Sequence, residues 1–258
     1  MIRQRLGKDL LFFDGGMGTL LQEKGLAPGE LPETWNLTHS EEIYKIHRQY
    51  IEAGSDIILT NTFGANALKF HDDSCSLEEI IKAAVSHVKK AEREALLQTG
   101  DERKIYTALD VGPTGKLLKP MGDLEFETAY EAFKEVVILG EQAGADLIHI
   151  ETMSDTYELK AAVLAAKENT SLPVFATVIF DERKKLLTGA DVSSVVALLE
   201  GLGVDALGIN CAMGPKEMLP VLEELIKYSS VPIIVKPNAG LPKQRDGKTY
   251  YLSLIHIS

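Results

Sequence analysis

A thiol at the end of a predicted strand is the residue in this sequence best suited to chemistry. Cys211 follows the short apolar run ALGIN, residues 206–210, and a Gly-Pro turn begins three positions later. Chemistry in α/β proteins gathers at the carboxyl ends of the strands. A thiolate there is a good Zn²⁺ ligand, but a catalytic zinc usually has three protein ligands. The residues alone leave two interpretations of Cys211 open, a metal ligand and a structural cysteine.

Carboxylates stand at the ends of two other predicted strands. Asp14 follows the segment 10–13 and opens the turn DGGMGT, whereas Glu151 ends the apolar run LIHIE. Because a carboxylate buried without a partner is costly, Glu151 needs a cation. That cation is either the ammonium group of a ligand, which we favour, or a neighbouring lysine. We expect Asp14 and Glu151 together to hold the amino group of an amino acid, although Asp14 could equally cap a tight turn.

Small polar residues follow a third strand and could bind a carboxylate. Asn61 and Thr62 lie in the sequence TNTFGAN and offer amide and hydroxyl donors next to a glycine. Gly15 would let a ligand approach the backbone, because glycine has no side chain. Thr62 taken alone is also a suitable cap for the helix that follows.

The remaining metal-ligand residue types are predicted to have no functional role. His149 lies two residues before Glu151, on the same strand face, and is interpreted as a hydrogen-bonded core residue. Cys75 lies in the polar segment HDDSCS and is interpreted as incidental. Surface positions are predicted for the histidines on helix or loop patterns, which are His39, His47, His71 and His87.

A recurring pattern positions these residues. A helical pattern, then Gly-x-Asp, then an apolar run occurs at Gly54, Gly144 and Gly203. A second pattern opens strands at Pro173 and Pro232, and the spacing from Gly144 to Pro173 equals that from Gly203 to Pro232. This spacing is close to the length of a βαβ unit, about 30 residues.

Short, continuous apolar runs predict strands that are covered on both faces. They lie at residues 10–13, 56–60, 105–110, 147–151, 174–179, 206–210 and 233–236. Amphipathic patterns predict helices at 40–53, 77–97, 128–143, 156–169, 192–202 and 216–228. The even rhythm, and the lack of a GxGxxG loop after the first strand, favour a (β/α)8 TIM-type barrel over a doubly wound sheet.

The predicted barrel lacks its eighth strand and helix. We expect an incomplete barrel over residues 1–242 and a polar tail over 243–258. Residues 252–258, LSLIHIS, resemble translated sequencing adapter, so we expect them to be non-native. On this interpretation the chain is the truncated part of a larger protein.

Composition excludes several classes of partner. The 258 residues are 45% hydrophobic and 25% charged, with a net charge of −11 and no basic stripe, which argues against a nucleic-acid partner. No apolar run approaches the roughly 18 residues that span a membrane, and the apolar run at the N-terminus is too short for a signal peptide. Two distant cysteines make no disulfide framework, so we expect a cytoplasmic protein with reduced thiols.

The motifs at the strand ends, taken together, resemble the homocysteine S-methyltransferase family. They are DGGMGTLLQ (14–22), PETWNL (32–37), TNTFGAN (60–66), IETMSD (150–155), GINC (208–211) and KPNAGLP (236–242). The chain is most similar to the N-terminal homocysteine-binding module of the cobalamin-dependent methionine synthases. The resemblance covers nearly the whole chain and implies a (β/α)8 barrel.

The resemblance also implies a set of site residues. Family members bind zinc through three cysteines, of which Cys211 matches the first, while the adjacent pair has no counterpart here. Asp14 and Glu151 would bind the homocysteine ammonium. The homocysteine carboxylate would contact Gly15 and the region of Asn61 and Thr62, and Asn238 would lie near the metal.

The reaction implied by the resemblance is transfer of a methyl group to the homocysteine thiolate, which gives methionine. A free thiol titrates near ~8.5, and coordination to Zn²⁺ deprotonates it. The donor would be methylcobalamin on a separate module, recharged by methyltetrahydrofolate on another. Betaine and S-methylmethionine, the donors of related barrels, stay open as alternatives.

Two other interpretations remain at this stage. Lys236 ends the last predicted strand, where Schiff-base aldolases keep their nucleophile, so an aldolase-type barrel is the rival enzyme. The other interpretation is an inert fragment with an open barrel edge and at most a weak zinc site.

Overall fold

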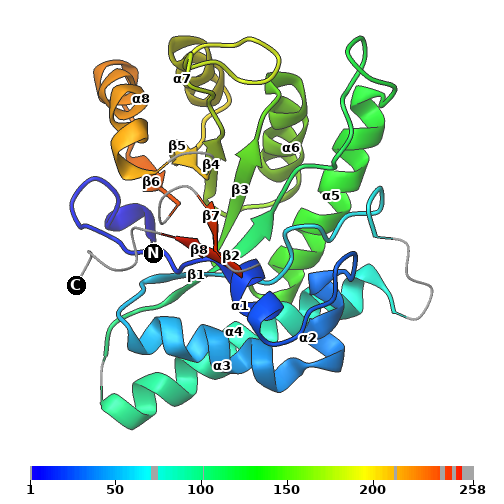
Figure 1. The fold of residues 1–258 in the computed structure, drawn as a ribbon, viewed down its shortest axis with the longest axis vertical. Helices are drawn as coiled ribbons and strands as arrows, with labels where there is room; N and C mark the ends of the chain where they lie inside the picture. Colours follow the sequence, from blue (N-terminus) through cyan, green and yellow to red (C-terminus); the bar gives the residue numbers. More distant parts are fainter. Residues whose placement is uncertain are drawn as a thin grey trace.

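The computed structural model describes residues 2–70, 75–100, 102–211 and 214–238, and the backbone of 242–245 and 248–251. Its centre is a sheet of six parallel strands that curls into part of a barrel, with neighbouring strands in chain order (Figure 1). The strands are β1 (Ile57–Leu59), β2 (Tyr106–Val111), β3 (Leu147–Met153), β4 (Val174–Val178), β5 (Ala206–Asn210) and β6 (Ile233–Lys236). This order is what a chain of right-handed βα units produces, so the repeat predicted from the sequence is confirmed.

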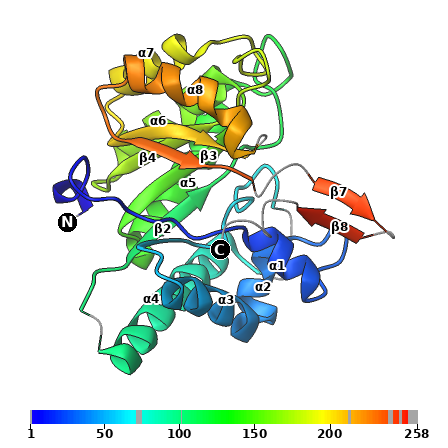
Figure 2. The same cartoon turned by 60° about the vertical axis from the view of Figure 1, so that its left-hand side comes forward.

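The first predicted strand is reduced to a single parallel bridge. Phe13 pairs with Ile57, and the backbone N–H of Ile57 donates to the carbonyl of Phe12 at 3.0 Å. Residues 10–13 therefore lie in the position expected for a strand, beside β1, but form too few ladder bonds to count as one. Figure 2 shows this segment in blue, crossing the side of the sheet between β6 and β1.

Helices cover the outside of the sheet. They are α3 (Ser40–Glu52), α4 (Leu77–Thr99), α5 (Phe126–Ala143), α6 (Thr156–Asn169), α7 (Val192–Gly201) and α8 (Pro215–Tyr228). Short elements precede them: η1 (Ile2–Gln4), α1 (Met17–Glu23), η2 (Pro32–Thr34) and α2 (Trp35–Thr38). A hairpin of β7 (Pro242–Arg245) and β8 (Lys248–Tyr251) follows β6. The predicted helices are confirmed, and residues 252–258 lie outside the described part of the chain.

Local signals fix several helix ends. Ser76 caps α4 through a reciprocal capping box with Glu79, which satisfies two backbone donors at once. Gly144 ends α5 with φ of 96°, a left-handed conformation that favours glycine. Among the described residues, no helix has the length and apolar content that crossing a membrane requires.

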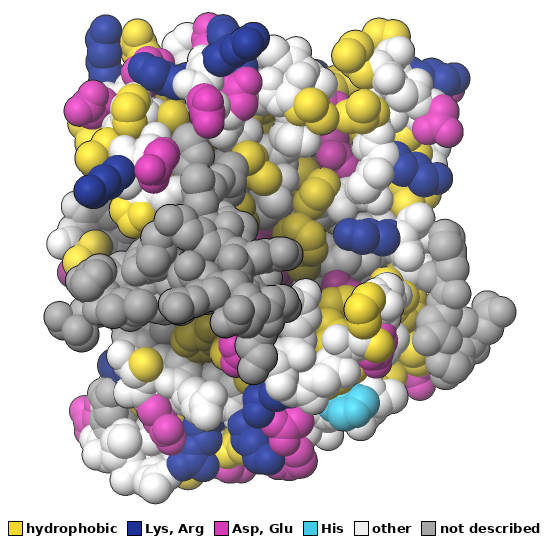
Figure 3. Space-filling model, viewed as in Figure 1, with side chains coloured by type: hydrophobic (Ala, Val, Ile, Leu, Met, Phe, Trp, Pro, Cys, Tyr) yellow, Lys and Arg dark blue, Asp and Glu magenta, His cyan; other side chains and the backbone are white. Residues whose placement is uncertain are grey.

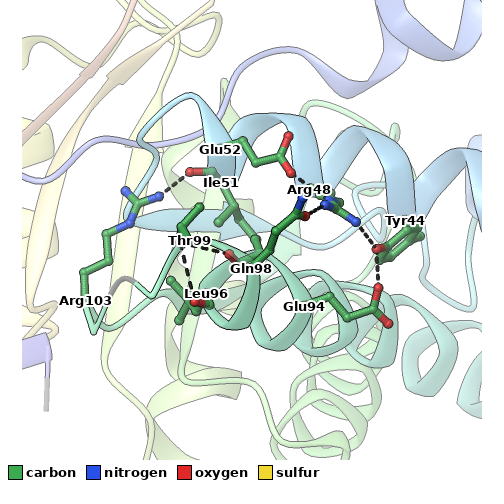
Figure 4. A network of polar contacts seen from close by, with 10 residues as sticks. Tyr44, Arg48, Ile51, Glu52, Glu94, Leu96, Gln98, Thr99 and Arg103 are labelled. Carbon is green, nitrogen blue, oxygen red and sulfur yellow. Dashed lines mark hydrogen bonds and ion pairs between the residues drawn. The ribbon is translucent and has the colours of Figure 1, made fainter.

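Polar contacts join α3 to α4 at the surface (Figure 4). Arg48 donates to Glu52 at 2.7 Å and to the Tyr44 hydroxyl at 3.1 Å, and that hydroxyl donates to Glu94 at 2.5 Å. Such exposed pairs contribute little stability individually. Acidic and basic side chains are interspersed over the face shown in Figure 3.

Hydrophobic side chains form two layers, one on each side of the sheet. The larger layer lies between the sheet and the outer helices. The inner layer fills the inside of the curl with alternate strand residues, and Ile2 of η1 packs against them. Its members on the strands are Ile57, Leu59, Tyr106, Ala108, Leu147, Phe175, Ala206 and Ile234.

The prediction that His47 lies at the surface is wrong. Its side chain is fully buried, because it falls on the same helical stripe as Ile43 and Ile51, one turn away on either side. Burial lowers the pKa of His47 to about 3, so the ring is neutral. His87 is half-buried, with Nε2 2.7 Å from the carbonyl of Asn36. His39 is exposed as predicted, and His71 lies outside the described residues.

Candidate functional site

A cavity of about 850 Å³ opens at the carboxyl ends of the strands. Its floor is the inner hydrophobic layer, and its sides include the N-terminal segment and β6. Successive alternate positions along a strand point to the same side. On β2, β3, β5 and β6, the inward-facing positions nearest the carboxyl end of the strand are therefore polar, and their side chains line the cavity. They are Asp110, Glu151, Asn210 and Lys236.

An ion pair lies at the centre of this polar layer. Nζ of Lys236 is 2.5 Å from Oε2 of Glu151, and the two side chains are only 17% and 12% exposed. Burial raises the pKa of Glu151, but the Lys236 ammonium and the His149 ring outweigh it and hold the pKa below its ordinary value. Burial lowers the pKa of Lys236, but Glu151 and other carboxylates outweigh it and raise the pKa. Both groups are therefore charged at neutral pH.

Two rings support the ion pair from the interior. The Phe13 ring centroid lies 5.1 Å from Nζ of Lys236 and 5.0 Å from the centroid of His149. Nε2 of His149 is 3.3 Å from Oε2 of Glu151. His149 is fully buried, and this burial lowers its pKa, so the ring is neutral. The predicted core position is confirmed, but neither ring nitrogen has a hydrogen-bond partner among the described residues.

Asp14 interacts electrostatically with both members of the ion pair. Its Oδ2 accepts a hydrogen bond from the backbone N–H of Leu59 at 2.9 Å. Its Oδ1 is buried and has no hydrogen-bond partner among the described residues. Burial raises the pKa of Asp14 to about 7, although Lys236 opposes the rise. Asp14 thus has one buried oxygen without a hydrogen-bond partner among the described residues, and it holds its proton more tightly than an ordinary aspartate.

A third carboxylate, Asp110, faces the same ion pair from the end of β2. It is 6% exposed, and its buried Oδ1 likewise lacks a hydrogen-bond partner among the described residues. Burial raises its pKa well above the ordinary value, and the negative charge of Glu151 adds to the rise. Sequence reasoning missed Asp110, although it ends an apolar strand just as Glu151 does.

Cys211 stands at the rim in a conformation that non-glycine residues seldom adopt. Its φ is 55°, and Thr152 at the end of β3 has φ of 65°. The amide of Asn210 connects them: it accepts from the N–H of Thr152 at 3.0 Å and donates to the Cys211 Sγ at 3.3 Å. Such strained residues are held by their surroundings and cluster at functional sites. Burial and the charge of Glu151 raise the pKa of the Cys211 thiol, so the thiol is protonated at neutral pH.

The other predicted site residues divide into those at the cavity wall and one behind it. Gly15 lines the cavity, and a side chain there would meet the Tyr50 hydroxyl at 2.7 Å. Asn61 and Asn238 also line it, and the Asn61 amide donates to the carbonyl of Pro32 at 2.7 Å. Thr62 does not line the cavity.

Thr62 instead anchors the end of β2. Its hydroxyl donates to the carbonyl of Asp110 at 2.8 Å and lies 2.7 Å from the Thr60 hydroxyl. The Asp110 N–H in turn donates to the Thr60 hydroxyl at 3.1 Å. The two threonines therefore fix where the Asp110 side chain begins.

Cys211 at the rim is the type of ligand that zinc prefers, but the described residues supply fewer ligands than a zinc site needs. Sulfur is a preferred zinc ligand, and Cys211 supplies one sulfur at the cavity wall. Within residues 2–70, 75–100, 102–211 and 214–238, no group of three His, Cys, Asp or Glu side chains is arranged to hold a metal ion. Cys75, the other cysteine, packs against the outer hydrophobic layer.

Comparison with known proteins identifies the family. The sequence profile of the homocysteine S-methyltransferase family matches residues 11–255. The chain therefore belongs to the homocysteine S-methyltransferase family, and the resemblance noted in its motifs is confirmed.

Methionine synthases are among its relatives. Those of Mycobacterium leprae and Mycobacterium tuberculosis are each 34% identical to it, over 250 and 248 residues. The alignments cover 93% and 92% of this chain but 21% of each relative. The chain thus spans about a fifth of the length of the curated relatives it matches.

Solved structures agree with this placement. The metallated form of the homocysteine methyltransferase MmuM from Escherichia coli superposes with a TM-score of 0.81 at 25% identity, over 91% of this chain and 85% of that one. The apo form of the same protein gives a TM-score of 0.76 at 25% identity, over 90% and 83% of the two chains.

Proposed function

We propose that this chain binds homocysteine and presents its sulfur for methylation to methionine, as the homocysteine-binding module of a methionine synthase. The observation that carries the proposal is that one cavity joins two cation-binding carboxylates, Asp14 and Glu151, to the Cys211 thiol. Family membership and the methionine synthase relatives support it.

The amino-acid end of homocysteine would lie among the strand ends. Its ammonium would bind Glu151 and the unpartnered Oδ1 of Asp14. Its carboxylate would lie against the backbone of Gly15 and near Asn61, where no side chain of residue 15 intervenes. Thr62 would act indirectly, through the position of β2. Holding both ends of the amino acid orients its sulfur toward the rim.

Zinc would be held at that rim by Cys211 and by ligands from outside the described residues. The metallated form of MmuM supports a metal in this family. A bound zinc ion would supply a positive charge that lowers the pKa of a thiol, which the buried rim by itself raises. Asn238 lines the cavity and would lie near the metal.

We also propose that the partial barrel described here is seven-eighths of a (β/α)8 barrel over residues 1–242, followed by a tail over 243–258.

The methyl donor is proposed from the relatives. Because the chain spans 21% of each methionine synthase, cobalamin- and folate-binding modules would belong to the remainder of a longer protein. Methylcobalamin on such a module would approach the open rim of the cavity.

The two cysteines form no disulfide, which supports a reducing, cytoplasmic setting.

The ion pair argues against the aldolase alternative. A Schiff-base lysine must be neutral to attack a carbonyl, whereas Glu151 holds Lys236 charged and raises its pKa. Borohydride trapping with a range of carbonyl compounds should leave Lys236 unmodified. An adduct on Lys236 would instead support the aldolase.

Calorimetry and methyl transfer test the proposal. The chain, supplied with zinc, should bind homocysteine and convert it to methionine with free methylcobalamin as donor. Glu151→Gln should weaken homocysteine binding strongly, whereas Glu131→Gln, on the exposed face of α5, should not. Binding that is equally strong in Glu151→Gln would overturn the assignment of the ammonium. A wild-type chain that binds neither zinc nor homocysteine would support the inert-fragment alternative.

A further inference from the structure

The cavity holds more buried carboxyl groups than the proposed substrate contacts use. Glu151, Asp14 and Asp110 all interact electrostatically with Lys236. Glu151 is paired with it directly, while Asp14 and Asp110 each keep one buried oxygen without a hydrogen-bond partner among the described residues. Leaving a buried carboxylate oxygen unpaired is costly, so both oxygens are suited to receiving a cation.

Substrate binding as proposed creates a conflict at Glu151. Its Oε2 already accepts the Lys236 ammonium at 2.5 Å. A ligand ammonium bound between Glu151 and Asp14 would lie close to the Lys236 ammonium, and two cations this close repel each other. This repulsion favours the movement of Lys236 to another acceptor.

Asp110 is the remaining carboxyl group that acts on Lys236 once the ligand occupies Glu151 and Asp14. Glu33, another carboxyl group at the cavity wall, also has a buried Oε2 without a hydrogen-bond partner among the described residues. The carboxylates that raise the pKa of Lys236, however, are Glu151, Asp14 and Asp110. The Thr60 and Thr62 hydroxyls hold the backbone of Asp110 at the end of β2, so its side chain begins at a fixed position in the cavity that Lys236 also lines. A lysine side chain has several rotatable bonds, so its ammonium can change acceptor without a change in the backbone.

We infer that Asp110 is a positioning residue that takes over the Lys236 ammonium when the substrate ammonium binds Glu151. Lys236 serves as an internal cation that keeps Glu151 paired in the empty site. Asp110 keeps the displaced lysine paired in the filled one. This inference rests on the proposed function, because it assumes that Glu151 and Asp14 bind the ligand ammonium.

Two ligands, one with an amino group and one without, distinguish a positioning role of Asp110 from a purely structural role. Asp110→Asn should raise the Kd for homocysteine about tenfold, the effect of losing one charge-assisted hydrogen bond. It should leave the Kd for 4-mercaptobutyrate nearly unchanged, because that compound lacks the amino group and leaves Lys236 on Glu151. In a Lys236→Met background, Asp110→Asn should have no further effect on homocysteine. The matched control Asp123→Asn removes an exposed carboxylate outside the cavity and should change neither Kd.

The structure of a double variant without ligand is the second test of the inference. In the double variant Asp14→Asn and Glu151→Gln, both competing carboxylates are neutral, so Lys236 should hydrogen-bond to Asp110. A Lys236 side chain that turns away from Asp110 would overturn the inference, as would equal losses of homocysteine and 4-mercaptobutyrate affinity in Asp110→Asn. If the wild-type chain fails to bind homocysteine, the proposed function fails. The structure of the double variant still tests whether Lys236 can move from Glu151 to Asp110. If the double variant does not fold, the two ligands decide it.

Discussion

The side chain of Asn210 joins the end of β5 to the end of β3, although β4 lies between these strands. Its Oδ1 accepts from the backbone N–H of Thr152 at 3.0 Å, and its Nδ2 donates to the Thr152 hydroxyl at 2.7 Å. Both Thr152 and the next residue after Asn210, Cys211, have positive φ. The amide therefore fixes two strained rim residues relative to each other.

Replacing Asn210 by alanine should loosen the rim. The variant loses the two bonds to Thr152 and the contact with Sγ of Cys211, and the N–H of the half-buried Thr152 loses its partner. We expect a loss of about 1–3 kcal/mol in the free energy of unfolding, measured by urea denaturation, and weaker homocysteine binding. Asn169→Ala removes similar bonds on α6 and should reduce stability without affecting homocysteine binding. Equal effects of both variants on binding would contradict a local role for Asn210.

Zinc binding should depend on one of the two cysteines. Cys211→Ser replaces the sulfur at the cavity wall by a poorer zinc ligand, so the zinc content of the purified chain should fall to background. Cys75→Ser is the matched control, because Cys75 packs against the outer hydrophobic layer, and it should retain the wild-type zinc content. Atomic absorption measures both, and retention of zinc in Cys211→Ser would remove Cys211 from the metal site.

The pH dependence of stability should carry a signature of Asp14. Burial raises its pKa in the folded state to about 7, above the ordinary value of 3.8. The folded state thus binds the proton more tightly than the unfolded state between these values. The contribution of Asp14 to stability is fully present below pH 3.8 and is lost as the pH rises to about 7, at up to about 1.4 kcal/mol per pH unit.

Asp14→Asn removes this titration and isolates it from other groups. Urea denaturation between pH 4.5 and 8 should show a shallower decline of stability with pH in Asp14→Asn than in the wild type. Asp110, whose pKa is raised by burial and also by the charge of Asp14, contributes the same sign in both proteins. Removing the charge of Asp14 lowers the pKa of Asp110 and so changes the profile in the same direction. Parallel pH profiles for the two proteins would show that Asp14 ionises normally in the fold.

Gly208 should tolerate no side chain. A Cβ there would lie 1.8 Å from the carbonyl oxygen of Ile234, because β5 and β6 approach closely inside the curl. Gly208→Ala should reduce stability by about 3 kcal/mol or more, since backbone rather than a flexible side chain must move. Gly201→Ala is the control: no atom lies within 4 Å of its Cβ at the end of α7, and it should be neutral or slightly stabilising. Thermal unfolding of the two variants compares them directly.

Most strands and helices could be predicted because their signals are local. Apolar runs after Gly-x-Asp placed β1, β3 and β5 within a residue or two, and amphipathic patterns placed the starts of α3 and α7 at residues 40 and 192. The N-terminal segment formed one bridge instead of a strand, because pairing depends on a neighbour that local sequence does not describe. His47 was misplaced because a polar residue on a helix suggests solvent, whereas its stripe faces the interior.

The sequence by itself determined which residues reach the carboxyl ends of the strands, and so that Asp14, Glu151 and Cys211 would share one cavity. The alternation of a strand and the order of parallel strands impose that result. Only the tertiary structure decided the charge arrangement. Lys236 pairs with Glu151, Asp110 faces both, and Asn210 reaches across β4 to Thr152. These relationships join residues that are 41 to 126 positions apart, and they depend on how tightly the sheet curls, which no local pattern encodes.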